Sequence, residues 1–263
     1  MCYTVSAVPD QGTTSTMRQI RIGTSGWVYP EWRGAFYPEG LPQRLELAHL
    51  AGQVNSVEIN GSFYSLRSPA NYRSWADRTP DDFVLAVKGP KLVTHTRRLH
   101  DVEDALTAFF ESGVRELGPK LGPVLWQFPP SLHFDADSLA AFLELLPTRP
   151  IRHAIEARHR SFHDPAFLEL LRAHDIAVVV ADSAGRFPMI EQVTTDFVYV
   201  RLHGDEELYA SDYSPEALEQ WAGKIRGWAT DRDVYVYFDN TMRGAAPHNA
   251  IALADRLGVL SRE

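Results

Sequence analysis

The sequence contains a single cysteine, Cys2, among its 263 residues. One thiol cannot form an internal disulfide, so a reducing compartment, the cytoplasm, is expected. A chain of this length can bury roughly three quarters of its unfolded surface, so its core needs no cross-links. The fold is therefore expected to be stabilised by packing alone.

Long apolar runs are absent as well. No stretch approaches the ~18 apolar residues that a membrane span requires. A secretory signal has a basic segment followed by an apolar one, and the first eighteen residues contain no such pattern. Because they are small, polar and aperiodic, we expect a disordered leader over residues 1–18 and one domain over residues 19–263, with Met17 as an alternative start. No membrane partner is expected.

Basic residues are outnumbered, with 26 Lys and Arg against 34 Asp and Glu and a net charge of -8. Domains that coat nucleic acid are normally basic, which argues against such a partner. A local basic site with exposed aromatic residues would still allow single-stranded nucleic acid to bind. No GxGxxG follows the first apolar run, so no nucleotide cofactor is indicated. The cofactor stays unknown, with a divalent metal left open.

The sequence does contain eight short runs rich in Val, Ile, Phe and Tyr, each bounded by Gly, Pro, Asn or Asp. Their length and composition are typical of β-strands. They cover residues 20–27, 54–60, 83–90, 122–129, 153–159, 176–182, 197–204 and 234–240.

Helical patterns lie between most of these runs. Apolar residues at i, i+3 and i+4 predict a helix over 102–117, with Asp101 as its N-cap and Gly118-Pro119 as its end. Asp164 and Ser214 each precede a proline and are typical helix caps. Further helices are predicted at residues 42–52, 68–78, 139–146 and 249–259, whereas residues 183–196 hold at most a short one.

Strands that alternate with helices predict parallel pairing and right-handed crossovers. Eight such units predict a single (β/α)8 barrel of the TIM type, with an α/β fold class. An open doubly wound sheet is the competing architecture, but its glycine-rich phosphate loop is missing.

The predicted strands are apolar until their last residues and then become polar. In a barrel these carboxyl ends meet on one face, where barrel enzymes place their chemistry. Side chains alternate with period two, so Glu58 shares a face with Asn60, and Val84, Ala86 and Lys88 share another. By the same argument, Val178, Val180 and Asp182 are expected to point into the barrel, with Asp182 at the end of the row.

We therefore predict a pocket for a small polar, anionic molecule at this face. Glu58, Lys88 and Glu156 are the predicted catalytic residues. The predicted substrate-binding residues are Trp27, Asn60, Phe63, Tyr64, His95, Gln127, Arg158, Asp182, Arg201, His203, Asp239 and Asn240.

Several motifs together resemble the YecE-like family, also called domain of unknown function 72. They are GTSGW, VEIN with Phe63-Tyr64, VK with Thr94-His95, QFP, EARHRSF, YVRLHG and YFDNT, which span residues 20–259 in order. The resemblance implies a TIM-type barrel and no established reaction. Phe162 departs from the family pattern, which often has Trp at that position.

Three chemistries remain open. The carboxylates Glu58 and Glu156 could flank a glycosidic bond and act as acid and base. Alternatively, Glu156, Asp182, His203 and Asp239 could hold Mg²⁺, Mn²⁺ or Zn²⁺ in a hydrolase or isomerase. The third and favoured alternative is recognition of an anion by Lys88, Arg158 and Arg201, with Glu58 or Glu156 transferring a proton. Binding without turnover is the non-enzymatic alternative.

Overall fold

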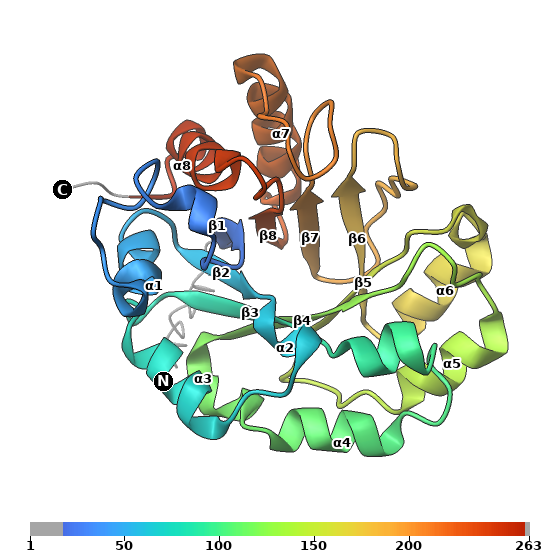
Figure 1. Cartoon of the computed structure of the whole chain (residues 1–263). Helices are drawn as coiled ribbons and strands as arrows, with labels where there is room; N and C mark the ends of the chain where they lie inside the picture. Colours follow the sequence, from blue (N-terminus) through green and yellow to red (C-terminus); the bar gives the residue numbers. More distant parts are fainter. Residues whose placement is uncertain (1–17, 261–263) are drawn as a thin grey trace, which may run out of the picture.

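Eight parallel strands close into a barrel in sequence order in the computed structural model, which describes residues 18–260 (Figure 1). The predicted leader and the alternative start at Met17 lie outside the described residues, except for Arg18. The strands are β1 (Ile20–Ser25), β2 (Ser56–Ile59), β3 (Val84–Lys88), β4 (Leu121–Gln127), β5 (His153–Glu156), β6 (Ala177–Asp182), β7 (Phe197–Leu202) and β8 (Asp233–Phe238). All eight predicted strands and the (β/α)8 barrel are confirmed.

Helices surround the outside of the barrel (Figure 1). Within residues 18–260 none of them is both long enough and apolar enough to cross a membrane. They are α1 (Gln43–Ala51), α2 (Gly61–Tyr64), α3 (Pro69–Asp77), α4 (Glu103–Glu111), α5 (Ala136–Glu144), α6 (Pro165–Ala173), α7 (Pro215–Trp228) and α8 (Ala245–Leu257), with short 3-10 or π turns at Pro30–Trp32, Leu92–Thr96, Val114–Lys120 and Arg160–Phe162.

Two of the predicted helix caps are confirmed. The side chain of Asp164 accepts a hydrogen bond from the Ala166 amide at 2.9 Å, and that of Ser214 accepts one from the Ala217 amide at 3.1 Å. These bonds satisfy amides that a helix start leaves without a partner. Residues 183–196, all of them described, contain no helix and connect β6 directly to β7.

The prediction for residues 101–117 is wrong in two respects. Asp101 is not a cap: it has a φ of 50°, and Val102 is the residue before α4. The helix also ends early, at Glu111, because Gly113 takes a φ of 117° and starts a separate 3-10 turn. The apolar periodicity continued across this break because both segments pack on the same core.

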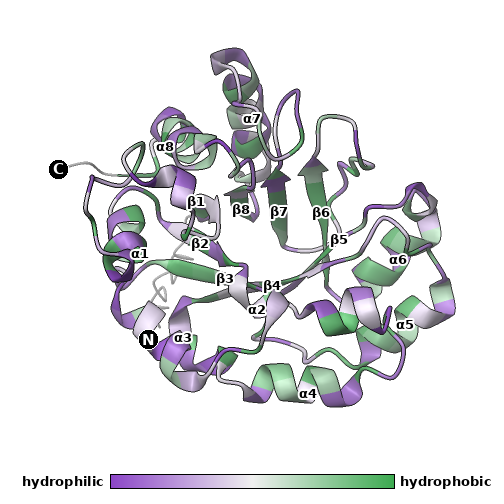
Figure 2. Ribbon diagram, in the orientation of Figure 1, coloured by the Kyte–Doolittle hydropathy of each residue, from purple (hydrophilic) through white to green (hydrophobic). Residues whose placement is uncertain are grey.

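The barrel interior combines small residues on one side with aromatic residues on the other. Its buried residues are Ala86, Leu125, Ala154, Ala177, Val179, Ala181, Phe197, Tyr199, Tyr235 and Tyr237. The strands and the inward helix faces are apolar, and the polar residues lie mainly on the outer helix faces and loops (Figure 2). With period two, the next inward positions are Lys88, Gln127, Glu156, Arg201 and Asp239. The polar residues therefore form a layer directly on top of the apolar core.

Asp182 does not belong to this layer. The inward residues of β6 are Ala177, Val179 and Ala181, whereas Val178 and Val180 belong to the outer core between the strands and the helices. The predicted inward row of Val178, Val180 and Asp182 is thus wrong by one residue. In a strand buried on both faces, the sequence alone does not distinguish the two faces.

Gly23 allows β1 to approach β2 closely. It lies opposite Ser56, and a Cβ at position 23 would lie 1.8 Å from the Ser56 carbonyl oxygen. We expect Gly23→Ala to lower the free energy of unfolding by roughly 3 kcal/mol, the upper end for overpacking. Urea denaturation measures this change.

Gly223 in α7 provides the matched control, because a Cβ there would meet nothing within 4 Å. Gly223→Ala should raise stability by about 0.5–1 kcal/mol through helix propensity. A Gly23→Ala protein as stable as the wild type would contradict the proposed close approach of the two strands.

Candidate functional site

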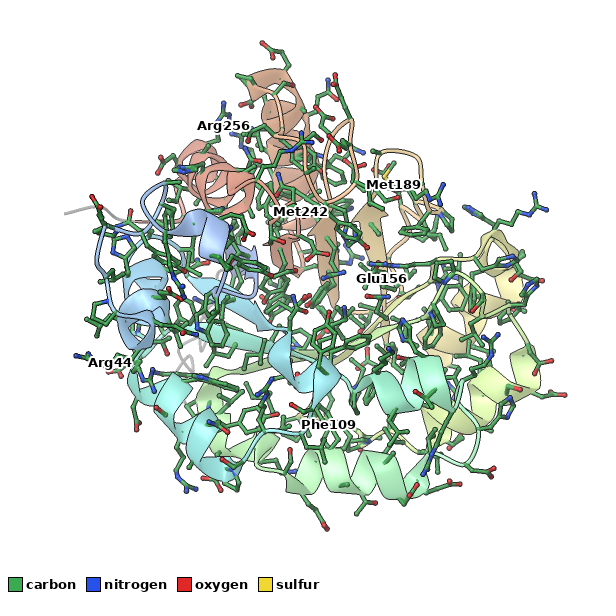
Figure 3. The ribbon with its side chains drawn as sticks, in the orientation of Figure 1. Arg44, Phe109, Glu156, Met189, Met242 and Arg256 are labelled. Atoms are coloured by element: carbon green, nitrogen blue, oxygen red, sulfur yellow. The ribbon has the colours of Figure 1, made fainter. Side chains whose placement is uncertain are left out.

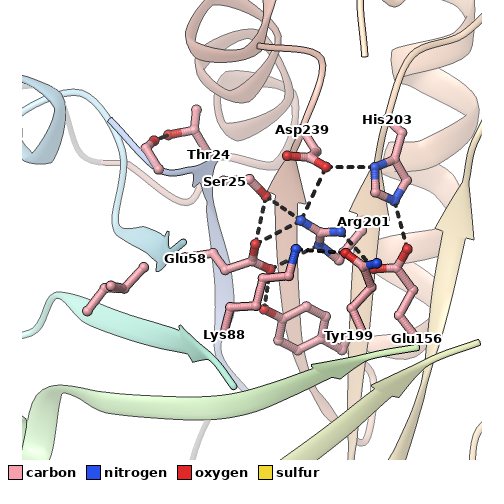
Figure 4. Close-up of polar contacts among 12 residues, drawn as sticks. Thr24, Ser25, Glu58, Lys88, Glu156, Tyr199, Arg201, His203 and Asp239 are labelled. Carbon is pink, nitrogen blue, oxygen red and sulfur yellow. Dashed lines mark hydrogen bonds and ion pairs between the residues drawn. The ribbon is translucent and has the colours of Figure 1, made fainter. Parts of the chain in front are cut away.

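Arg201, on β7, lies fully buried at the centre of the polar layer (Figure 4). Its guanidinium donates to three side chains from three other strands. Nε and Nη2 contact the two oxygens of Glu58 at 3.0 and 2.8 Å, Nη1 contacts Glu156 Oε2 at 2.7 Å, and Nη2 also reaches Ser25 Oγ at 3.0 Å. Asp239 Oδ2 lies 3.2 Å from Nη2. A single arginine thus holds three carboxylates together.

Both carboxylate oxygens of Glu58 accept two hydrogen bonds each. In addition to the two bonds from Arg201, its carboxylate accepts from Ser25 Oγ at 2.9 Å and from the Tyr199 hydroxyl at 2.7 Å. The side chain is completely buried. Four hydrogen bonds, two of them from a guanidinium, fix the position of this carboxylate.

Glu156 is similarly constrained. Arg158 Nε donates to its Oε1 at 2.7 Å, and His203 Nε2 lies 3.3 Å from the same oxygen. Burial alone would raise the pKa of Glu156, but Arg158 and Arg201 hold this pKa well below its usual range. Glu156 therefore remains ionised at neutral pH.

His203 connects Glu156 to Asp239. Its Nδ1 lies 2.9 Å from Asp239 Oδ2. Burial would raise the pKa of Asp239, yet Arg201 and His203 lower it instead. The network thus extends through five strands, from Ser25 on β1 to Asp239 just after β8.

A cavity of about 1040 Å³ opens above this network. Its lining residues include Trp27, Tyr29, Arg44, Asn60, Phe63, Tyr64, Arg67, Trp75, Arg78, Lys88, His95, Gln127, Arg158, Tyr209, Asp239 and Thr241. Glu58, Glu156, Arg201 and His203 are not among them, so they lie beneath its floor. Figure 3 shows Glu156 on the β5 side of the barrel and Arg44 outside the strands, near α1. The cavity therefore extends from the barrel mouth to the periphery.

Lys88 is the buried amine at the mouth, with 9% of its surface exposed. Nζ donates to Gln127 Oε1 at 2.7 Å and lies 4.4 Å from the centre of the Phe63 ring. No carboxylate of residues 18–260 forms an ion pair with it. Burial and the charge of Arg201 lower its pKa to about 8, against the opposing effect of the nearby carboxylates. A substantial fraction of the amine is thus neutral near pH 8.

The charged lining of the cavity is mostly basic. Five cations line it against one carboxylate, Asp239. Burial and the charge of Lys88 lower the pKa of His95 to about 4, so its ring is neutral at pH 7. The five cations are Arg44, Arg67, Arg78, Lys88 and Arg158. The protein, although acidic overall, has a local excess of positive charge at this face.

Residues 21–263 match the family model described as "Protein of unknown function DUF72". The chain belongs to the DUF72 family. This match confirms the resemblance found in the sequence motifs.

The known relatives agree on the fold. The UPF0759 protein YecE of Escherichia coli K12 is 29% identical over 147 residues, 54% of this chain and 50% of YecE, so the match spans about half of this curated relative. A crystal structure of a DUF72 family protein from Thermotoga maritima is 29% identical with a TM-score of 0.81, covering 92% of this chain and 100% of that one. A DUF72 family protein from Enterococcus faecalis, at 20% identity and a TM-score of 0.79, covers 93% and 97% of the two chains and shows the fold alone.

The predicted site residues of this DUF72 protein fall into three groups. The first group lines the cavity, and the second, Glu58, Glu156, Arg201 and His203, lies beneath it. Asp182 and Asn240 form the third group and point elsewhere, Asp182 accepting from the Tyr213 hydroxyl and Asn240 donating to Asn249 Oδ1. The first group is Trp27, Asn60, Phe63, Tyr64, Lys88, His95, Gln127, Arg158 and Asp239.

Sequence reasoning missed Tyr29, Arg44, Arg67, Trp75, Arg78 and Thr241, which also line the cavity. Arg44 and Trp75 lie on helices, and Arg67 and Arg78 lie beside helix ends, so no strand end marked them. Only the first turn of a helix after a strand could have suggested Arg44, because that turn lies at the same face of a barrel.

The geometry does not support a glycosidase pair of Glu58 and Glu156. Such a pair needs an open space between its carboxyl groups for the scissile bond. Here the guanidinium of Arg201 fills that space and bonds to both.

The four residues considered as metal ligands do not fit a metal either. Asp182 faces away from the others, and Glu156 and Asp239 are already engaged by arginine. Within residues 18–260 no group of three His, Cys, Asp or Glu side chains could hold a metal ion. We therefore derive no step through a metal.

The low pKa of Lys88 can be measured directly. In competitive labelling with acetic anhydride followed by mass spectrometry, Lys88 should titrate at about pH 8. Glu156→Gln should lower the pKa of Lys88 further, because this carboxylate favours the charged amine. Titration of Lys88 at the ~10.4 of a free lysine would contradict the described environment.

Proposed function

We propose that this DUF72 protein is an enzyme that catalyses proton transfer on a small polar, anionic substrate, with Lys88 as the acid-base group. The observation that carries the proposal is a buried amine at the mouth of a large cavity, with a pKa of about 8 and no carboxylate partner among the described residues. General bases work best when their pKa lies near the operating pH. Perturbed groups of this kind concentrate at functional sites.

The anionic substrate follows from the charge of the lining. At the mouth, the Arg158 guanidinium is held by Glu156 and by the Tyr209 hydroxyl, to which Nη1 donates at 2.7 Å. An arginine fixed in this way binds a carboxylate or phosphate with little loss of side-chain entropy. Asp239 presents a carboxylate edge to the same cavity and can accept a hydrogen bond from a substrate hydroxyl.

In this proposal Glu58 and Glu156 are positioning residues. Both lie beneath the floor, where they pair with Arg201, and Glu156 also holds Arg158, which lines the cavity. Their carboxylates also raise the pKa of Lys88, which keeps it near 8 despite its burial. The proton-transfer role predicted for them from the sequence passes to Lys88.

A neutral amine at this position also supports a second candidate, covalent catalysis through a Schiff base. The lone pair of Nζ would attack a substrate carbonyl carbon, and the resulting carbinolamine would lose water to form the imine. Reduction with borohydride in the presence of substrate distinguishes the two, because only an imine leaves a stable mass increase on Lys88.

A turnover screen tests the proposal. Wild type, Lys88→Met and Lys91→Met are incubated with anionic metabolites fractionated by anion exchange, and the products are followed by mass spectrometry. We expect at least one compound to be consumed by the wild type and by Lys91→Met, and not by Lys88→Met. Equal consumption by all three would refute the role of Lys88, and binding without consumption would favour a non-catalytic ligand-binding protein.

A further inference from the structure

The cavity continues outward from the barrel mouth to the surface formed by α1 and α3. We call this part the outer lobe; its lining residues are Trp27, Arg44, Tyr64, Arg67, Trp75 and Arg78. Figure 3 labels Arg44 near α1, apart from Glu156 on β5. Of the cations that line the cavity, Arg44, Arg67 and Arg78 belong to the outer lobe, and Lys88 and Arg158 lie at the mouth.

The three arginines of the outer lobe have no acidic partners. No ion pair within residues 18–260 includes any of them, although acidic residues outnumber basic ones in the chain. Arg67 Nη2 donates only to the Gly61 carbonyl at 2.8 Å, and its Nε is buried with no hydrogen-bond partner. Arg78 Nη1 donates to the Arg44 carbonyl at 3.0 Å. Backbone carbonyls thus position two guanidiniums without neutralising their charge.

The start of α1 adds to the positive potential. Gln43 and Arg44, the first two residues of this nine-residue helix, line the cavity. The preceding residue is Pro42, and no side chain caps the helix. Uncapped amides at a helix start carry partial positive charge and favour anions.

Aromatic rings form part of the lining of the outer lobe. Trp27 and Trp75 meet edge to face, with ring centres 5.4 Å apart, and Trp75 also packs on Tyr72 at 5.3 Å. Both tryptophans are partly exposed, and Tyr64 is 78% exposed. Fixed rings of this kind offer a surface for a planar or apolar group at low entropic cost.

We propose that the outer lobe is a second anion subsite, and that the substrate is an elongated molecule with an anionic group at each end. Arg44, Arg67 and Arg78 bind the outer phosphate or carboxylate, and a planar or apolar segment lies against Trp27 and Trp75. The inner anionic group contacts Arg158 at the mouth. This inference rests on the proposed function, since it extends the substrate that Lys88 acts on.

Calorimetric titration with α,ω-alkanebisphosphonates of two to ten methylene groups tests the second subsite, with monophosphonates of equal length as reference. We expect one length to bind the wild type at least tenfold more tightly than its monophosphonate. The double variant Arg67→Gln/Arg78→Gln should remove this gain and leave monophosphonate affinity within twofold. A parallel series of α,ω-dicarboxylates shows which of the two anions the subsite prefers.

Arg172→Gln is the matched control, because Arg172 is an exposed arginine in the last turn of α6. It should bind every probe like the wild type. Tryptophan fluorescence gives a second readout, since a bisphosphonate of the optimal length should change the emission of the wild type and Trp27→Phe should reduce that change. Circular dichroism establishes that each variant is folded.

The inference is overturned if no bisphosphonate binds more tightly than its monophosphonate, or if the double variant keeps the gain. Failure of the proposed function is recognised separately. Bisphosphonate affinity that depends on Arg67 and Arg78, together with turnover that is unaffected by Lys88→Met, would refute the role of Lys88 and leave the second subsite supported.

Discussion

Arg201→Met is expected to lower the free energy of unfolding by about 4 kcal/mol at pH 7. Glu58, Glu156 and Asp239 all contact the Arg201 guanidinium, and all three are well buried. Removing one partner of a buried ion pair typically costs ~3–5 kcal/mol, because the remaining charge has lost its hydration and its counterion. Urea denaturation followed by circular dichroism measures this loss.

The pH dependence should be weaker in this variant. In the wild type the pKa of Glu156 and of Asp239 is lowered, so their contribution to stability is present above the unfolded pKa values of ~4 and is lost as pH falls below them. Without Arg201 both pKa values should rise, because burial raises them and one of the charges that lowers them is gone. Less stability then depends on the ionised carboxylates, so the difference in stability between the wild type and the variant should shrink as pH falls below ~4.

Two further variants serve as controls for Arg201→Met. Arg172→Met removes an exposed arginine from α6 and should change stability by less than ~0.5 kcal/mol. The triple variant Arg201→Met/Glu58→Gln/Glu156→Gln carries two fewer unpaired charges and should recover part of the loss at pH 7. An Arg201→Met protein that is as stable as the wild type at pH 7, or that loses as much stability as the wild type below about pH 4, would contradict the described network.

The barrel could be predicted from the sequence because its signals are local. Each strand is a short β-branched run ended by polar residues, and caps such as Asp164 follow from one side chain and one amide. The error at residues 101–117 arose where local signals conflict. Apolar periodicity predicted one helix, but Gly113 ends the first segment with a positive φ that only the folded backbone reveals.

The site was harder to predict because its chemistry depends on which charges touch. The sequence placed Glu58, Glu156 and Arg201 at strand ends, yet it could not show that one guanidinium neutralises both carboxylates. It also could not show that Lys88 receives no such partner. The contrast between a saturated carboxylate and an unpaired amine depends on contacts across the barrel, between residues 39 to 143 positions apart in the chain.

With a substrate identified by the turnover screen, Lys88→Met should lower kcat by about 10³-fold. Removing a general acid-base group typically costs 10²–10⁴-fold in rate. Stability should not fall, because holding the amine charged in this site is unfavourable. The fall in pKa from 10.5 to about 8 means that keeping the amine charged in the folded protein costs roughly 3 kcal/mol. Methionine has a similar length and no charge, so Lys88→Met removes this cost.

The pH profile gives a readout that a merely structural role would not move. If the neutral amine is the base, kcat/KM of the wild type should rise with pH and level off above about 8. Glu156→Gln should shift this limb to lower pH, because it removes a carboxylate that favours the charged amine. Lys88→Arg should stay inactive, because a guanidinium does not deprotonate in this range. A Lys88→Met enzyme with wild-type kcat, or a wild-type profile flat between pH 6 and 9, would show that the proton is transferred by another group.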